Sequence, residues 1–254
     1  MRITESTPGA PCWAEHGSAD PRAAQAFYGE LFGWRPEPDP RAEAGGYTVM
    51  VLGEDPVAAV SPLAAPERPT AWTVVLATAD ADATAATAKA AGGATLTAPV
   101  DVFDEGRFAL LADPAGAAFS VWQPGAFRGA ALIGDPGSLG WIELATRDVP
   151  GALEFYPRLF GWSVSPGESY TQWGLDGRDF GGVLDMGEQF PADLPPYWMP
   201  YFAVADVDLS AARAVGLGAE AVLPPTDVPD GPRLAVLRDP LGAVFGIYLA
   251  DASG

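Results

Sequence analysis

The sequence has little of what many functional sites require. Its 254 residues include one cysteine, Cys12, and one histidine, His16, and 33 acidic residues outnumber 14 basic ones. A single cysteine excludes an internal disulfide and is typical of the reducing cytoplasm, where we expect the protein to act. The formal net charge of −19 argues against a nucleic-acid partner, because such binding needs Lys and Arg to neutralise phosphates.

Long apolar runs are also missing. Hydrophobic residues make up 48% of the chain, yet no run approaches the roughly 18 apolar residues of a membrane-spanning helix. Residues 1–11 lack the basic and apolar regions of a secretory signal, so we expect a soluble protein without a membrane partner. The chain is long for one domain and short for three, which favours two domains.

An internal repeat divides the chain into two copies. Trp13-Ala-Glu15 recurs as Trp141-Ile-Glu143, and Asp113-Pro-Ala-Gly116 recurs as Asp239-Pro-Leu-Gly242. Recurrence of several segments in the same order indicates a tandem duplication. We expect domains at 1–128 and 129–254, and we interpret the Gly-rich stretch 125–140 as the linker between the copies.

Each copy is predicted to contain two βαβββ modules, near 10–65, 69–124, 138–190 and 197–250. A strand at 11–17 or 139–146 leads into an amphipathic helix that Asp20 or Asp148 caps. The second helix of each copy is expected to begin near Asp82 or Asp208. A ferredoxin-like duplication would give a similar number of helices, but its modules have fewer strands after the helix.

Four segments resemble the vicinal-oxygen-chelate superfamily of glyoxalases, bleomycin-resistance proteins and dioxygenases. They are the strand–Asp–helix opening, Phe27-Tyr28, Leu31-Phe-Gly-Trp34 and the closing strands around 107–116, each with its counterpart in the second copy. The resemblance covers nearly the whole chain. It implies an α+β fold, a tandem duplication of a vicinal-oxygen-chelate domain whose four βαβββ modules form two cup-shaped mixed sheets with helices outside. Such a fold hosts many functions.

The resemblance also implies where a metal would be held. Family ligands, usually His and Glu, lie on the first strand of each module and near the end of the closing strand. The matching positions are Trp13, Thr73 and Ser120 in copy one, and Trp141, Met199 and Gly246 in copy two. None of these side chains suits a divalent metal, so we expect no metal and no other cofactor. Ordinary glyoxalase or dioxygenase chemistry is therefore not expected.

Three titratable side chains on the first strands need an interpretation. His16 lies three residues after Trp13, so strand alternation turns it toward the helices, where a satisfied and partly buried side chain is the plainest reading. Glu15 and Glu143 should face into the cups. Each is a candidate general base, an acceptor for a ligand's hydroxyl or cationic group, or a solvated carboxylate at the rim.

Aromatic residues take the place of metal ligands in the predicted cups. Phe180 is expected to help close cup two, whereas Trp34, Trp72, Trp162 and Trp198 are assigned to packing. Rings on a concave sheet offer stacking sites for a planar ligand, and the acidic chain favours a cationic one. The predicted ligand-binding residues are Trp13, Glu15, Phe103, Phe108, Trp122, Trp141, Glu143, Tyr170, Trp173, Tyr197, Met199, Tyr201 and Tyr248.

The leading hypothesis is a metal-free protein that sequesters a planar aromatic natural product. The chain is similar to two-domain actinobacterial members of the superfamily, of the hydroxylase-like type, and to accessory proteins of daunorubicin and doxorubicin clusters. That similarity implies an anthracycline ligand, self-resistance, and a link to a tailoring oxygenase whose product inhibition is relieved. A monomer is favoured over a homodimer, because duplication pairs the modules within one chain.

Two other hypotheses stay open. One is a cofactorless isomerase, cyclase or epoxide-opening enzyme of polyketide tailoring, in which Glu15 or Glu143 transfers a proton. The other is a scaffold that binds a partner and keeps vestigial cups. Recovery of the ligand after binding separates the three, because an enzyme changes the ligand and a scaffold does not bind it.

Overall fold

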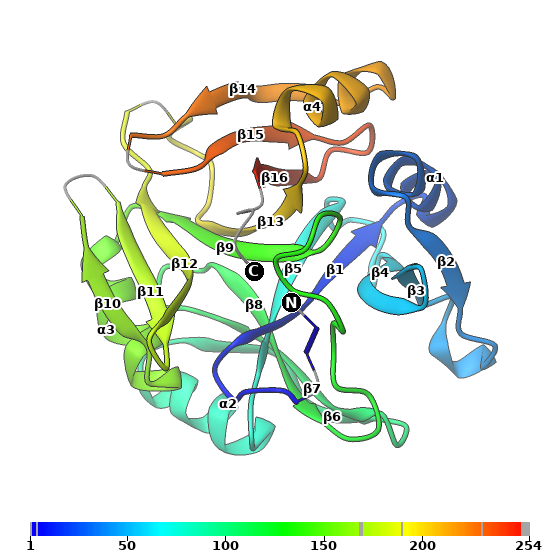
Figure 1. Cartoon of the computed structure of the whole chain (residues 1–254). Helices are drawn as coiled ribbons and strands as arrows, with labels where there is room; N and C mark the ends of the chain where they lie inside the picture. Colours follow the sequence, from blue (N-terminus) through cyan, green and yellow to red (C-terminus); the bar gives the residue numbers. More distant parts are fainter. Residues whose placement is uncertain (1, 4, 168–169, 189, 230, 250–254) are drawn as a thin grey trace.

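The protein folds into two eight-stranded mixed sheets, one for each copy (Figure 1). The computed structural model describes residues 2–3, 5–167, 170–188, 190–229 and 231–249. Sheet one has the strand order β2-β3-β4-β1-β5-β8-β7-β6, and sheet two repeats it as β10-β11-β12-β9-β13-β16-β15-β14. The duplicated α+β fold predicted from the sequence is confirmed.

The strands follow the repeat closely. Sheet one contains β1 (Pro11–Ser18), β2 (Arg35–Pro38), β3 (Thr48–Leu52), β4 (Asp55–Pro62), β5 (Ala71–Ala77), β6 (Ala94–Val102), β7 (Gly106–Ala112) and β8 (Ala118–Pro124). Sheet two contains β9 (Leu139–Thr146), β10 (Ser163–Pro166), β11 (Thr171–Leu175), β12 (Arg178–Asp185), β13 (Tyr197–Val204), β14 (Glu220–Asp227), β15 (Arg233–Arg238) and β16 (Val244–Leu249).

Two strands were not expected from the sequence. β2 and β10 each form one edge of their sheet and are the first of the three strands that follow the helix in the first module. Both are four residues long and exposed throughout. Short, proline-containing edge strands carry no alternation of apolar and polar residues, which explains why the sequence pattern does not indicate them.

Aspartates begin all four helices, which are α1 (Pro21–Phe32), α2 (Ala81–Ala90), α3 (Val149–Phe160) and α4 (Val207–Gly216) in the described part of the chain. Asp20 and Asp148 accept a hydrogen bond from the backbone N–H three residues later, as predicted. Helices α2 and α4 start within one residue of the predicted Asp82 and Asp208, and Asp80 and Asp206 are their caps. Asp82 and Asp208 lie in the first turns, where they pair with arginines. No described helix has the length and apolarity needed to cross a membrane.

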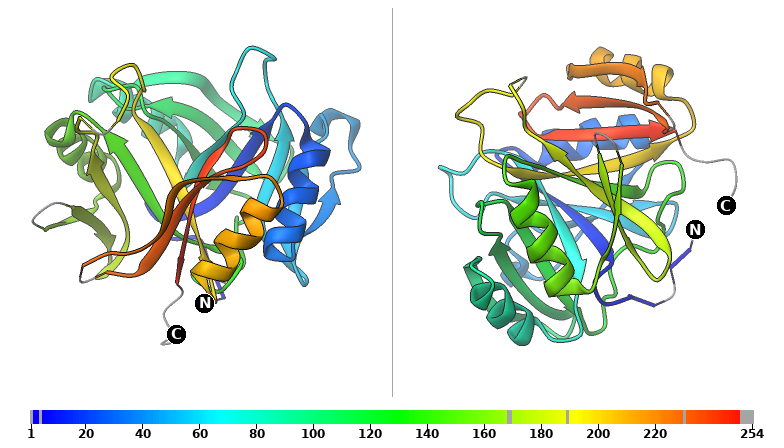
Figure 2. Two further views of the ribbon diagram at one scale, coloured as in Figure 1. Left: turned by 90° about the horizontal axis from the view of Figure 1, so that it is seen from above. Right: turned by 90° about the vertical axis from the view of Figure 1, so that its left-hand side faces the viewer.

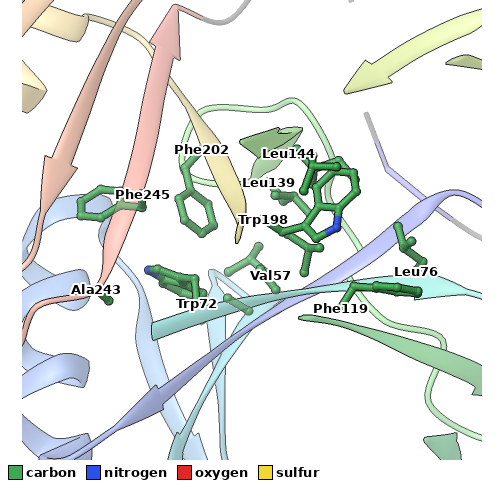
Figure 3. Packing of buried hydrophobic residues seen from close by; sticks show 14 of the residues in the cluster. Val57, Trp72, Leu76, Phe119, Leu139, Leu144, Trp198, Phe202, Ala243 and Phe245 are labelled. Carbon is green, nitrogen blue, oxygen red and sulfur yellow. The ribbon is translucent and has the colours of Figure 1, made fainter. Parts of the chain in front are cut away.

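The two sheets share one apolar core. Its members come from both copies, and Trp72 on β5 and Phe202 on β13 lie 5.1 Å apart between their ring centres (Figure 3). Helix α1 packs near α4 and α2 near α3 at the sides of this core (Figures 1 and 2). The four tryptophans assigned to packing, Trp34, Trp72, Trp162 and Trp198, are all buried, which confirms that assignment.

Polar contacts across this core are reciprocal between the copies. Trp34 Nε1 donates to the Gly137 carbonyl at 2.7 Å, and Trp162 Nε1 donates to the Gly9 carbonyl at the same distance. Each indole thus ties one copy to the segment that precedes the first strand of the other. Buried donors that find acceptors in this way add orientation to an otherwise non-directional apolar contact.

A second reciprocal pair joins tyrosines to aspartates. Tyr28 Oη donates to Asp239 Oδ2 at 2.9 Å, and Tyr156 Oη donates to Asp113 Oδ2 at 3.1 Å. His16 adds to the first contact only, with Nε2 2.8 Å from Asp239 Oδ2. His16 lies toward the helices, as expected, but its side chain is only half satisfied, because Nδ1 is buried without a hydrogen-bond partner among the described residues. Its burial is complete rather than partial, because Asp239 reaches it from the other copy.

Candidate functional site

Each sheet turns one face toward the shared core and the other face away from it. We call the second face hollow one in sheet one and hollow two in sheet two. Hollow one carries a cluster around Trp13 and Val75, and hollow two carries a cluster around Met199 and Tyr201. Both clusters are separate from the core, so their side chains are not needed to pack the two copies together.

A buried carboxylate stands at the centre of hollow two. Glu143 on β9 is 8% exposed, and Tyr201 Oη on β13 donates to its Oε1 at 3.0 Å. The Tyr170 phenol also donates to Glu143, and it accepts a hydrogen bond from Trp141 Nε1 at 3.0 Å. Two phenols and an indole therefore hold the carboxylate in a fixed place.

Burial raises the pKa of Glu143 to about 7, even though the hydrogen bonds from Tyr201 and Tyr170 act to lower it. Within the described residues, no Lys, Arg or His side chain forms an ion pair with it. A carboxylate whose charge lacks a cationic partner attracts an incoming cation. A pKa near neutrality also suits a group that transfers protons.

Aromatic rings cover the rest of hollow two. Trp141, Tyr170, Tyr197 and Tyr248 are each partly exposed. Glycine makes room for two of the tyrosine rings, since a Cβ atom at Gly246 would collide with the Tyr201 ring and one at Gly182 with the Tyr170 ring. Both tyrosine rings therefore lie against the sheet, where Tyr201 is buried and Tyr170 keeps part of its surface exposed.

Hollow one repeats the pattern in a simpler form. Trp13 Nε1 donates to Tyr47 Oη at 3.0 Å, and Ser61 Oγ donates to Glu15 Oε1 at 2.8 Å. Burial raises the pKa of Glu15 against the lowering effect of the Ser61 hydrogen bond. Glu15 thus has one hydroxyl partner where Glu143 has two phenols.

The predicted site residues divide into three groups. Trp13, Glu15, Phe108 and Trp122 come together in hollow one, where Phe108 on β7 and Trp122 on β8 are cross-strand partners. Phe103 lies on the exposed turn between β6 and β7, with the Arg41 guanidinium 3.9 Å above its ring. In hollow two the structure brings together Trp141, Glu143, Tyr170, Tyr197, Met199, Tyr201 and Tyr248.

The predicted place of Trp173 in cup two is wrong. Trp173 on β11 is fully buried in the shared core, 5.5 Å from Trp198 and 5.2 Å from Trp162 between ring centres. Trp173 pairs with Gly181. The next residue on β12, Gly182, pairs with Gln172 and faces the hollow. A one-residue step along a strand reverses the face. Phe180 likewise packs against Trp162 instead of closing the hollow.

The structure adds three residues that the sequence did not single out. Tyr47 and Ser61 hold the polar groups of hollow one, and Phe127, from the linker, packs on its tryptophans. The Tyr-Thr pair at 47–48, which recurs at 170–171 just before the matching strand, was a signal for Tyr47. Phe127 has no counterpart in the repeat, so only three-dimensional structure reveals it.

The side chains of the hollows do not fit a divalent metal. Strand register brings together Trp13, Val75 and Ser120 in hollow one, and Trp141, Tyr201 and Gly246 in hollow two. No group of three or more His, Cys, Asp or Glu side chains gathers in the part of the chain that the structure describes. Each hollow offers a single carboxylate, whereas metal-activated chemistry needs several converging ligands.

Two surface depressions lie outside the hollows. One of about 430 Å³ is lined by residues that include Ala77, Gln123 and Arg128, and one of about 760 Å³ by residues that include Arg147 and Phe190. Neither depression is lined by the carboxylate and ring cluster of hollow two. In hollow two the rings themselves form the exposed surface.

The sequence comparisons agree with this fold. The model of the glyoxalase-like domain matches twice, at residues 14–122 and 141–248, so the chain belongs to the glyoxalase-like domain family. The chain is 38% identical to the anthracycline biosynthesis protein DnrV of Streptomyces peucetius, over 99% of both chains. It is 34% identical to the putative glyoxylase CFP32 of Mycobacterium bovis, over 96% of both chains.

Solved structures show the same architecture. The Mn(II)-bound glyoxalase from Novosphingobium aromaticivorans matches with a TM-score of 0.67 and 20% identity, covering 98% of this chain and 83% of that one. The 2,3-dioxygenase LapB from Pseudomonas sp. KL28 matches with a TM-score of 0.68 and 11% identity, covering 97% and 93%. At these identities the similarity establishes the fold alone.

Proposed function

We propose that the protein binds a planar aromatic natural product of the anthracycline class in hollow two and releases it unchanged. The observation that carries this proposal is the combination of a buried carboxylate without a cationic partner and partly exposed rings around it. Flat rings stack on Trp and Tyr, and an amino group on the ligand would find its counter-charge at Glu143.

The relatives support the chemical class of the ligand. Two similar chains of matching length are named anthracycline biosynthesis proteins, DnrV and DauV, each 38% identical to this one. An anthracycline joins a flat fused-ring quinone to an amino sugar, which matches the rings and the carboxylate of hollow two. The acidic chain adds long-range attraction for a cationic ligand.

Sequestration gives such binding a physiological purpose. In the cytoplasm, a protein that binds the product of a tailoring oxygenase lowers its free concentration by mass action. Lower free product relieves inhibition of the oxygenase and protects the producing cell. A metal-free binder is sufficient for this role, because no bond in the ligand changes.

A titration with doxorubicin tests the proposal. We expect quenching of tryptophan fluorescence with a micromolar or lower Kd, and recovery of unchanged doxorubicin by chromatography after denaturation of the complex. The neutral anthracycline aglycone, which lacks the amino sugar, should bind more weakly. Absence of quenching with either compound would refute the proposal and leave the scaffold hypothesis.

The second candidate function is a cofactorless enzyme. The observation that favours it is the pKa of Glu143, which burial raises to about 7. Such a carboxylate accepts a proton from a ligand carbon and returns it elsewhere, as in an isomerisation that needs no other reactant. A new compound of unchanged mass after incubation, and its loss in Glu143→Gln with retained binding, would establish the enzyme over the binding protein.

A further inference from the structure

The linker between the copies crosses hollow one. Ala126 N–H and Phe127 N–H donate to the carbonyls of Asp104 and Glu105 in the second module, at 3.0 Å each. Ala130 N–H then donates to the Cys12 carbonyl on β1 at 2.8 Å. These backbone hydrogen bonds fix the linker to both modules of copy one, so it is a built part of the hollow.

The Phe127 ring fills the space between the two tryptophans of hollow one. Its centre lies 5.1 Å from that of Trp13 and 6.2 Å from that of Trp122, and both pairs are edge-to-face. Trp122 Nε1 also donates to the Phe127 carbonyl at 2.9 Å. The Phe127 ring therefore contacts the same two indoles that a flat ligand would contact.

Arg41 connects the two modules of copy one at the rim of hollow one. Arg41 precedes the short 3₁₀ helix Ala42–Ala44 of the first module, and it forms ion pairs with Asp39 and Glu105. Its guanidinium also lies over the Phe103 ring. The first module is thereby tied to the β6–β7 turn, which is the same turn that anchors Phe127.

The exposure of equivalent tryptophans records the difference between the hollows. Trp13 is 3% exposed beneath the linker, whereas Trp141, its counterpart in hollow two, is partly exposed. The two residues keep the same partner type, because each indole donates to a tyrosine hydroxyl. The covering segment therefore accounts for the difference in exposure between these two tryptophans.

We propose that Phe127 is a built-in occupant of hollow one, so that hollow two is the sole ligand-binding hollow and the chain binds one polycyclic aromatic molecule. This inference rests on the proposed function for its ligand. It goes further because it assigns the stoichiometry and gives the linker a role. Removal of the Phe127 ring should convert hollow one into a second site of the same aromatic type.

Isothermal titration calorimetry with doxorubicin tests this assignment in the wild-type chain and in Phe127→Ala. We expect the stoichiometry to rise from one to two equivalents per chain. Phe103→Ala is the matched control, because it removes an exposed ring from the same turn while the backbone hydrogen bonds that hold Phe127 do not involve the Phe103 side chain; its stoichiometry should stay at one. Circular dichroism checks folding, and Phe127→Val repeats the test if the alanine variant unfolds.

Each outcome decides the inference separately from the proposed function. Two equivalents in the wild type, or one equivalent in both chains, overturns the role of Phe127 but keeps ligand binding. No binding in the wild type with one equivalent in Phe127→Ala supports that role and overturns ligand binding at hollow two. No binding in either chain overturns both.

Discussion

The two copies place the same aspartate in different electrostatic surroundings. Asp113 and Asp239 are both buried beneath a tyrosine of the other copy. Burial raises the pKa of Asp113. Burial acts in the same direction on Asp239, but the hydrogen bond and charge of His16, with the hydrogen bonds from Tyr28 and Ala243, together outweigh it, and the pKa of Asp239 is lowered. At the position that matches His16, copy two has Leu144. One side chain therefore decides whether a buried carboxyl is destabilised or stabilised as an anion.

On the outer faces of the sheets, matching carboxylates also have different surroundings. Glu15 and Glu143 occupy matching positions, yet one lies in a hollow covered by Phe127 and the other among exposed rings. The backbone of the duplication is preserved, while side chains and the linker give the two hollows different surfaces. The predictions below test this difference between the two halves, beginning with the substitution that should change the free energy of unfolding most.

Substitution of His16 by leucine should make the two aspartate sites alike. Asp239 would lose its partner while remaining buried, and removal of one member of a buried pair typically costs roughly 3–5 kcal/mol of unfolding free energy. Because the anionic form of Asp239 is stabilised in the fold, the loss should shrink as the pH falls below about 4. Urea denaturation measures it, with Leu144→Met as control. A loss under about 1 kcal/mol would contradict the prediction.

Glu143→Gln should stabilise the protein at pH 8 and have little effect at pH 5. The folded-state pKa of about 7 lies above the ordinary value of 4.5, so the folded chain binds more protons between these values. Stability contributed by this group is therefore full below pH 4.5 and is lost as the pH rises through 7. We expect a gain of roughly 2 kcal/mol at pH 8. Thermal unfolding at both pH values measures it, and the exposed Glu154→Gln is the control.

Trp141→Ala should weaken doxorubicin binding at least ten-fold, whereas Trp13→Ala should change it less than two-fold. The two indoles hold matching positions, but only Trp141 has exposed surface for a ligand. A stacked ring together with its buried area is worth more than about 1.4 kcal/mol, which corresponds to ten-fold in Kd. Calorimetric titration of both variants gives the order. Equal losses would mean that both hollows bind.

The smallest expected effect is the pH dependence of ligand affinity. Doxorubicin binding should tighten several-fold between pH 6 and pH 8, because Glu143 becomes a carboxylate as the pH passes about 7. Its attraction for the amino sugar then increases. Glu143→Gln should remove the dependence, and the neutral aglycone should not show it with the wild-type chain. An affinity that falls with rising pH would exclude Glu143 as the counter-charge.

Much of the fold could be predicted because the duplication repeats each local sequence pattern in both copies. The caps at Asp20 and Asp148 and the apolar faces of α1 and α3 are local, and their recurrence identifies the modules. The edge strands β2 and β10 were missed because exposed residues leave no pattern. The site was harder, since the face of Trp173 depends on a one-residue register that sequence does not define. The role of Phe127 depends on a non-local contact.

The reciprocal indole contacts of Trp34 and Trp162 indicate a further consequence of the fused chain. Two identical subunits related by a two-fold axis would form the same reciprocal contacts, because every contact across such an axis occurs twice. In a homodimer, each substitution would appear on both sides. In a single fused chain the two halves can differ in sequence. His16 and Leu144 can therefore occupy matching positions. The specialisation that we propose for hollow two depends on this release from symmetry.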